Sequence, residues 1–317
     1  MRSTAGILIG LASVAAQAGE PAYPVRPVRV LVSATPGGTI DLVARVLAPR
    51  LSEQTGQAFV VDNRAGAGGV IAAELIARAA PDGYTLGAVY TSFTTNAVLH
   101  RKPSYDPVND FSPLMLVSAS PLALVAYPGT GVDTVRNLLA LARTKPLHYA
   151  SSGNGSGGHM CGELLKLLAK VPAMHVPYKG AAAATADVVA GQVQFQFAGP
   201  VTVVSLARSG RLRLLAVTSL KRNAALPDVP TLDEAGVPGF DVVNWFGMVA
   251  PARLPVTLVN DLHRRMTAAL QHPEARARLG GEGAEVIAGT PESFAEFLRR
   301  DVAKWRKVVT ASGMSLD

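Results

Sequence analysis

The segment VRVLVSATPGGTIDLVARVL, residues 28–47, contains three kinds of local structure in succession. Val28–Ser33 is rich in β-branched residues and predicts a strand, and Thr35–Gly38 supplies the Pro and Gly of a turn. From Asp41 to Leu51, apolar residues recur at helical spacing. A strand, a Gly-rich turn and a helix in this order form the repeating unit of α/β proteins.

The same design returns in the second half of the chain. Leu147–Ser151 predicts a strand, Ser152–Gly158 is a loop of small residues, and His159–Ala169 predicts a helix. Strands and helices alternate between and after these two segments, which indicates an α/β fold with largely parallel sheets. Ligands of such sheets gather at the carboxyl ends of strands. We therefore expect each half of the chain to present one helix N-terminus to a shared cleft.

The composition restricts the class of protein. The chain has 317 residues, of which 49% are hydrophobic and 17% charged, and these values exclude a disordered or fibrous protein. At about 150 residues per domain, the length predicts about two domains. The single cysteine, Cys161, excludes an internal disulfide framework and a multi-cysteine zinc site. The net charge of +7 permits anionic partners, but scattered basic residues and only 6% aromatics predict no nucleic-acid partner.

Residues 1–18 have the pattern of a secretory signal peptide. Arg2 gives a positive start, Ala5–Ala16 is an apolar run, and Ala16-Gln17-Ala18 places small residues before a cleavage site, so cleavage is expected after Ala18. The apolar run is shorter than the about 20 residues that a membrane-spanning helix needs. The sequence therefore predicts an exported, soluble protein.

Motifs for other activities are incomplete. Gly153–Gly158 satisfies G-x-G-x-x-G, but the acidic residue that dinucleotide binding requires about 20 residues later is missing. The sequence has no P-loop, and its histidines lack metal-binding spacing, so no cofactor and no metal are predicted. Ser156 does not lie in G-x-S-x-G because residue 154 is Asn, although His159 could serve as its base. An exported α/β hydrolase that uses Ser156 and His159 is the alternative function.

The two small-residue loops are suited to binding a small anion. A helix N-terminus presents unpaired backbone N–H groups and a partial positive charge, so it stabilises a carboxylate without an Arg or Lys side chain. Hydroxyl groups add donors at the ends of both loops: Thr35, Thr39, Ser151, Ser152 and Ser156. The alternative is that these residues only form turns and helix caps.

Seven motifs follow one another along the chain: SATPGGTID (33–41), DNRAGAGG (62–69), APDGYT (80–85), YDPVNDF (105–111), GSGGH (155–159), VPYKG (176–180) and LPDVPT (226–231). In this order they resemble the Bug family of periplasmic solute-binding proteins, the receptors of tripartite tricarboxylate transporters. The resemblance runs from about Tyr23 to the C-terminus.

The resemblance implies a two-lobed α/β periplasmic binding protein, a type II-like Venus flytrap. Each lobe would be a mainly parallel sheet flanked by helices, with residues 23–124 and 247–317 in lobe 1 and residues 125–246 in lobe 2. Two crossing strands, at 122–127 and 244–250, would act as the hinge. The family implies a monomeric periplasmic receptor without catalysis. It would bind a small carboxylate, such as an amino acid, a dicarboxylate or an aromatic acid, for membrane transporter subunits or for a sensor.

The resemblance also implies which residues bind the ligand. In the first lobe they are Ser33, Thr35, Pro36, Gly37, Gly38, Thr39 and Asp41, with Tyr90, Thr91 and Ser92 from the loop at 90–95 after the third strand. In the second lobe they are Ser151, Ser152, Gly155, Ser156, Gly157, His159, Tyr178, Lys179 and Ala198. Asp41 would repel an anion in direct contact, so a structural cap is the preferred interpretation, and contact with a ligand amine or a water is the alternative.

The chain departs from the family pattern at three places. Ile40 stands where a small or hydroxyl residue is usual, Ala182–Ala184 replace a common Pro-containing stretch, and Ala198-Gly199-Pro200 lacks the frequent Asp or Asn. These departures predict a more apolar pocket.

Overall fold

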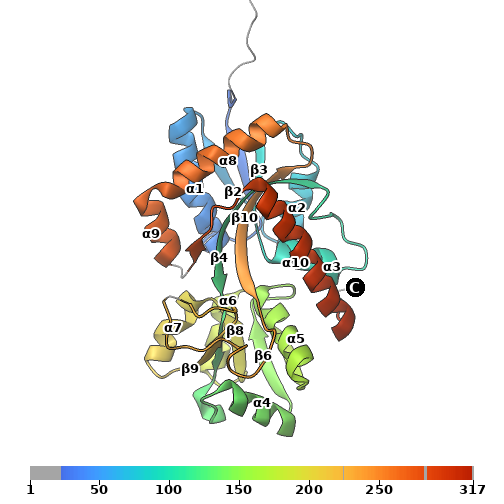
Figure 1. Cartoon of the computed structure of the whole chain (residues 1–317), viewed down its shortest axis with the longest axis vertical. Helices are drawn as coiled ribbons and strands as arrows, with labels where there is room; N and C mark the ends of the chain where they lie inside the picture. The colour runs from blue at the N-terminus through green and yellow to red at the C-terminus, as the bar shows by residue number, and fades with distance from the viewer. Residues whose placement is uncertain (1–22, 224, 282–283, 316–317) are drawn as a thin grey trace, which may run out of the picture.

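The computed structural model describes residues 23–223, 225–281 and 284–315, and it forms two lobes stacked along the long axis of the molecule (Figure 1). Each lobe is built on one β-sheet. The predicted signal peptide, residues 1–18, lies outside the described residues. Among those that are described, no helix combines the length and the apolar character needed to span a bilayer.

The first sheet has the strand order β11-β4-β10-β3-β1-β2. Its strands are β1 (Val28–Val32), β2 (Phe59–Asn63), β3 (Thr85–Tyr90), β4 (Phe111–Pro121), β10 (Val243–Pro251) and β11 (Glu285–Val286). One face packs on α1 (Thr39–Thr55), α8 (Val256–Gln271) and α9 (Pro273–Gly281), and the other on α2 (Val70–Ala77), α3 (Ser92–Leu99) and α10 (Pro291–Ser312). Alternate residues of β1 serve the two faces, since Val30 packs with α1 and Leu31 with α2.

The second sheet has the order β7-β6-β8-β5-β9. Its strands are β5 (Ala123–Ala126), β6 (Leu147–Ser151), β7 (Ala173–Pro177), β8 (Phe195–Ala198) and β9 (Arg213–Val217). The helices α4 (Val135–Thr144) and α5 (Gly157–Ala169) cover one face, and α6 (Ala181–Val189) and α7 (Pro200–Arg208) cover the other. The two-lobed α/β fold predicted from the sequence is confirmed.

The expectation of mainly parallel sheets is wrong, because both sheets are mixed. β1 runs parallel to β2 and β3, whereas β10 is antiparallel to both β3 and β4. In the second sheet β6 is parallel to β7 and β8, but β5 is antiparallel to β8 and β9. Each antiparallel pair contains β4, β5 or β10, the strands that meet the crossings between the lobes.

Two segments cross between the lobes, as predicted. β4 leads through Leu122 directly into β5, and the chain returns through residues 218–242 to β10. Thr218 is fully buried and joins the two crossings: its hydroxyl accepts the N–H of Leu122 at 2.8 Å and donates to the carbonyl of Val242 at 2.7 Å. Its backbone also pairs with both of these residues.

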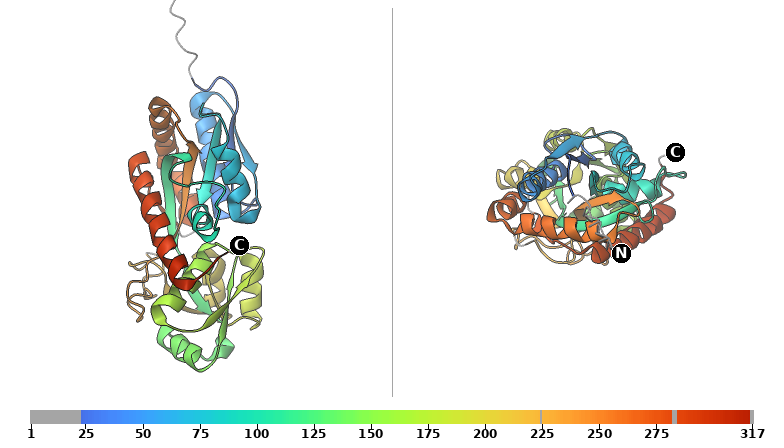
Figure 2. Two further views of the ribbon diagram at one scale, coloured as in Figure 1. Left: turned by 90° about the vertical axis from the view of Figure 1, so that its right-hand side faces the viewer. Right: turned by 90° about the horizontal axis from the view of Figure 1, so that it is seen from above.

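The last helix, α10, lies along both lobes (Figure 2, left). It begins where the Thr290 hydroxyl caps the N–H of Ser293 and Pro291 occupies the first turn. Its first half places Phe294 in the core of the first lobe, and its second half places Trp305 in the main core of the second. The helix therefore forms a third contact between the two lobes. The predicted lobe boundaries, at 124/125 and 246/247, stay predictions.

Candidate ligand-binding site

The carboxyl ends of the parallel strands face the junction of the lobes. β1 and β3 are parallel neighbours, so the loop after Val32 and the residues after Tyr90 leave the first sheet at one edge. In the second lobe, β6 ends at Ser151 and leads through a loop into α5. This is the arrangement in which α/β sheets bind ligands.

A cavity of about 380 Å³ lies between these strand ends. It is lined by residues of both halves of the molecule: Ala67, Gly68, Tyr90, Ser92, Asn96, His100, Ser152, Gly153, Asn154 and Ser156. Four of them, Tyr90, Ser92, Ser152 and Ser156, are among the predicted ligand-binding residues. The lining contains no Asp, Glu, Lys or Arg, so an anion here would be held by hydroxyl, amide and backbone donors.

Helix α3 brings the two halves of this cavity into contact. Thr95 donates its hydroxyl to the carbonyl of Gly155 at 2.6 Å, and Asn96 donates to the carbonyl of Gly68 at 3.0 Å. Gly155 has φ +72°, and a Cβ there would lie 2.3 Å from Asn96 Oδ1. The positive φ favours glycine here, and any side chain would also displace the Asn96 amide from its present position.

Polar side chains hold the loop at 152–156 of the second lobe by hydrogen bonds to its backbone. The buried Ser151 Oγ accepts the N–H of Gly153 at 3.1 Å and lies 2.6 Å from His175 Nε2. His159 Nδ1 accepts the N–H of Gly155 at 3.1 Å, and the Ser156 hydroxyl caps α5 by accepting the N–H of His159 at 3.3 Å. Of the predicted residues in this loop, Ser152 and Ser156 line the cavity, whereas Ser151 and His159 support the loop and do not line the cavity.

This hydrogen bonding argues against the hydrolase interpretation. A serine nucleophile needs its hydroxyl bonded to the imidazole of its base. In this structure the Ser156 hydroxyl accepts a backbone N–H and His159 Nδ1 accepts another. Burial also lowers the pKa of His159 to about 4, well below the pKa near 7 that suits a general base.

The loop of the first lobe is more exposed. Ser33 is buried and donates its hydroxyl to the carbonyl of Ala88 at 3.1 Å, whereas Thr35, Pro36, Gly37 and Gly38 are exposed. Gly38 is the N-cap of α1 and provides no side-chain cap. The N-cap position therefore carries no side chain that would compete with an anion for the helix N-terminus.

Asp41 has a structural role, in agreement with the preferred interpretation, although not as a cap of the first helical turn. Its carboxylate accepts the N–H of Gly37 at 2.9 Å, Nε of Arg45 at 2.9 Å and Nδ2 of Asn63 at 2.9 Å. Burial alone would raise the pKa of Asp41, but the bonds from Arg45, Gly37 and Asn63 hold this pKa below its ordinary value. The ionised side chain thus closes the loop before α1.

Several other predicted residues do not line the cavity. Thr91 donates to Asn244 Oδ1 at 2.7 Å and accepts the N–H of Trp245, so it belongs to the crossing region. Tyr178 donates its hydroxyl to Asp187 at 2.6 Å; burial, followed by this bond, raises the pKa of Tyr178 to about 12. The remaining members of this group are Gly157, which faces Leu122 and Asn244, Lys179, which is exposed, and Ala198, which is buried in β8.

The structure also corrects two expectations about the pocket. Ile40 is buried in the core of the first lobe, so it does not make the pocket more apolar. Residues 92–95, expected as part of a loop, begin helix α3. This helix supplies Asn96 and His100, four residues apart on one face, which sequence reasoning missed because Thr-rich segments have weak helix propensity. Ala67 and Gly68 were also missed, although the glycines at 66–69 marked an unusual turn.

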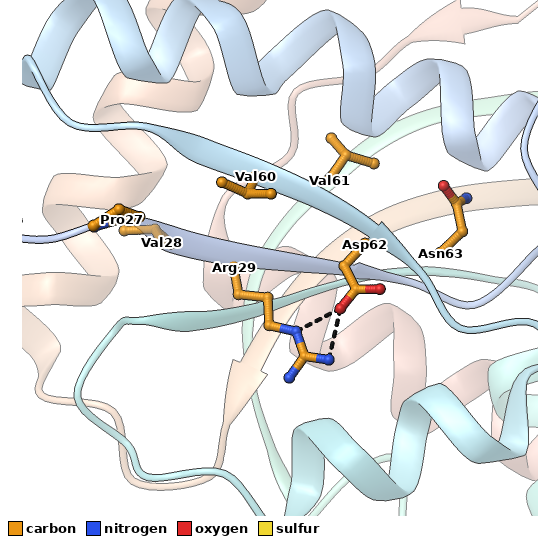
Figure 3. Close-up of a pocket in the computed structure, with 7 residues that line it drawn as sticks. All are labelled: Pro27, Val28, Arg29, Val60, Val61, Asp62 and Asn63. Atoms are coloured by element: carbon orange, nitrogen blue, oxygen red, sulfur yellow. Dashed lines mark hydrogen bonds and ion pairs between the residues drawn. The ribbon is translucent and has the colours of Figure 1, made fainter.

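A second cavity, of about 440 Å³, lies along the outer strands β1 and β2 (Figure 3). Its ionic side chains pair with each other, since Arg29 and Asp62 are 2.6 Å apart. It takes residues from one lobe only, so lobe closure cannot enclose a ligand there. The cavity between the lobes is the better candidate for the ligand site.

Two α/β lobes, two crossing segments and a polar cavity between strand ends define a solute-binding receptor. The chain matches the family described as the tripartite tricarboxylate transporter family receptor, TctC, over residues 43–314, and it belongs to this family.

Solved structures agree with this assignment. The chain is 36% identical to R. palustris Rpa4515, solved with adipate, with a TM-score of 0.83 over 92% of this chain and 99% of that one. It is 34% identical to the periplasmic binding protein BugD, with a TM-score of 0.81 and coverage of 92% and 99%. It is 32% identical to MatC from Rhodopseudomonas palustris with bound malate, with a TM-score of 0.80 and coverage of 90% and 100%.

Proposed function

We propose that this receptor binds a small organic carboxylate in the cavity between its lobes and closes around it. The observation that carries the proposal is the polar lining of this cavity, which comes from both lobes and contains no Asp, Glu, Lys or Arg. The solved relatives with adipate and malate support the same ligand class. The predicted residues that line the cavity, Tyr90, Ser92, Ser152 and Ser156, are part of the proposal together with the loop at 33–39. Ser151 and His159 enter it only as supports of the loop at 152–156.

The donors present are sufficient for useful affinity. A hydrogen bond to a charged group contributes about 1.5–3 kcal/mol. Three or four such bonds from loop N–H and hydroxyl groups offset the cost of ordering the ligand and reach micromolar affinity, about −8 kcal/mol. Because Gly38 at the N-cap has no side chain, a carboxylate can approach the N-terminus of α1 without displacing an N-cap side chain.

Closure would occur about the two crossings. We assign residues 23–124 and 247–317 to one lobe and residues 125–246 to the other, with Thr218 between the crossing segments. A ligand that contacts both lobes favours the closed form by its extra contacts there. The α10 helix, which packs on both lobes, would have to pivot on one of them.

The cellular role follows from the family. We propose that the chain is exported to the periplasm, that cleavage follows Ala18, and that the mature protein is a monomer that delivers its ligand to the small and large membrane subunits of a tripartite transporter. A sensor partner is the alternative. BugD, a periplasmic binding protein of similar sequence, supports this location.

The test is binding by the purified mature chain. Calorimetry against a panel of mono- and dicarboxylates that includes adipate and malate should find at least one ligand with micromolar or tighter affinity. Ser152→Trp, which fills the cavity, should lower that affinity at least tenfold, and Ser104→Trp, in the exposed loop before β4, should not. Stabilisation by NAD alone, with no carboxylate bound, would contradict the proposal.

The hydrolase alternative has its own test. Chromogenic esters should show no turnover above background with the wild-type protein. A rate that disappears in Ser156→Ala would establish catalysis and overturn the receptor as the sole function.

A further inference from the structure

A stacked pair of histidines, the buried His159 and the half-buried His175, lies beside the loop of the second lobe. The rings of His159 on α5 and His175 on β7 are 4.0 Å apart between centroids and 17° from parallel, and Tyr149 also stacks with His175 at 5.0 Å. Both histidines contact the loop, His159 through the N–H of Gly155 and His175 through Ser151 Oγ. Neither His159 nor His175 is among the residues that line the cavity.

The bond to Gly155 determines the charge and tautomer of His159. Nδ1 accepts a backbone N–H, so it carries no proton, and the neutral ring has its proton on Nε2. A second proton could only go to Nδ1, where it would face the N–H of Gly155. The bond would then break, and the loop would lose its support from α5.

The surroundings of the pair keep it neutral. Burial, with Lys166 as a smaller contribution, lowers the pKa of His159 to about 4; burial, followed by His159, lowers the pKa of His175 to about 3. Tyr149 donates its hydroxyl to Glu163 at 2.7 Å, and Lys166 lies 2.8 Å from the same carboxylate, so these charges compensate each other.

Of the remaining neighbouring elements, α10 contributes a cation and β8 contributes aromatic rings. On α10, which packs against α5, the Lys304 ammonium is bonded to the carbonyl of Asp241. The neighbouring β8 presents Phe195 and Phe197 to this core. Glu163 favours a proton on His175, but burial and the neighbouring positive charges outweigh it. For His159, burial and Lys166 both act against a second proton.

We propose that His159 and His175 form an acid-sensitive latch: as stacked neutral rings they hold the loop at 151–156 in its ligand-binding shape, and a proton on His159 releases the loop and weakens ligand binding. The inference rests on the proposed function only in taking this loop as one half of the ligand site. His159 and His175 are positioning residues, since they act through the backbone of the loop.

Hydrogen exchange of the loop tests the latch without any ligand. Exchange of a peptide covering residues 152–158, corrected for the intrinsic rate at each pH, should rise roughly fifty-fold between pH 6 and pH 4, because the protonated fraction of His159 rises from about 1% to about one half. His159→Asn keeps an acceptor near Nδ1 and does not titrate, so its loop should stay protected throughout. His148→Asn, on β6 but outside the pair, should behave like the wild type.

His159→Leu removes the acceptor and should expose the loop already at pH 7, with unchanged circular dichroism. Equal loss of protection in wild type and His159→Asn, whether by local opening or by unfolding of the whole chain, would overturn the latch. So would full protection of the wild-type loop down to pH 3.5.

Adipate affinity provides the second measurement. The ratio of the Kd of wild type to that of His159→Asn at one pH cancels the titration of adipate itself. This ratio should be one at pH 7, about two at pH 4 and about ten at pH 3. A ratio of one at every pH would overturn the latch. If no carboxylate of the panel binds at pH 7, the proposed function fails, and the exchange experiment still decides the latch.

Discussion

Gly158 lies in the first turn of α5 and packs directly against β8. A Cβ at this position would lie 2.6 Å from the carbonyl oxygen of Phe197. Contact at an ordinary distance begins near 3.4 Å, so Gly158→Ala requires the helix start or the strand to move by roughly 0.8 Å. The opposing atom is backbone held in the sheet, and no side-chain rotation can relieve the contact.

The cost follows from two opposing effects. Overpacking of a dense interior costs about 1–3 kcal/mol, and replacing a helical glycine by alanine recovers up to about 1 kcal/mol. We expect Gly158→Ala to lower the free energy of unfolding by about 1–2 kcal/mol. The shift also moves Ser156 and the loop before it, so affinity for the carboxylate ligand should fall with stability.

Urea unfolding, followed by the fluorescence of the two buried tryptophans, measures the effect. Gly280→Ala in α9 is the matched control, because a Cβ there meets nothing within 4 Å. This variant should be unchanged or more stable by up to about 1 kcal/mol. A Gly158→Ala protein as stable as Gly280→Ala would refute the packing argument.

Three further changes test single contacts. Asp41→Asn should lower the free energy of unfolding by about 2 kcal/mol near pH 7, with the exposed Asp228→Asn as control. Because the native pKa of Asp41 is lowered, its contribution to stability is present above about pH 4 and is lost as the pH falls through the native pKa. Equal unfolding curves for the two variants would contradict this. Thr218→Val leaves the N–H of Leu122 and the carbonyl of Val242 without their side-chain partner. It should lower the free energy of unfolding by about 1–3 kcal/mol, measured in urea. An unchanged urea midpoint would refute a role of Thr218 in joining the two crossings. Burial raises the pKa of Cys161, so a thiol reagent should modify it in urea but not in the native protein, and rapid native labelling would contradict its position in the core.

Local structure could be predicted wherever the signal was contained in a short segment. The strand at 28–33 and the following helix are found as β1 and α1, and Leu147–Ser151 is β6 with the bounds expected. The serine at 156 caps α5 because it precedes a helical run, a relationship within three residues. Helix α3 was missed because its stability comes from packing against α10 and not from its own propensity.

The candidate site was only partly predictable. Ser152 and Ser156 line the cavity because they lie in a loop that follows a strand, which a sequence pattern reveals. Tyr178 lies in a similar loop, but its side chain turns to Asp187 on α6, and no local pattern indicates which partner a hydroxyl will choose. Asn96 reaches the cavity only because the chain folds α3 against the other lobe.

By itself, the sequence determined the alternation of strands and helices, the two Gly-rich loops and, through ordered motifs, the family. These properties depend on periodicity and turn residues within about twenty positions. Only the tertiary structure decided that both sheets are mixed, that Thr218 joins the crossings and that His159 and His175 stack beneath the ligand loop. Each of these depends on groups far apart in the chain, whose contact is set by burial of the two cores and by pairing of buried polar groups.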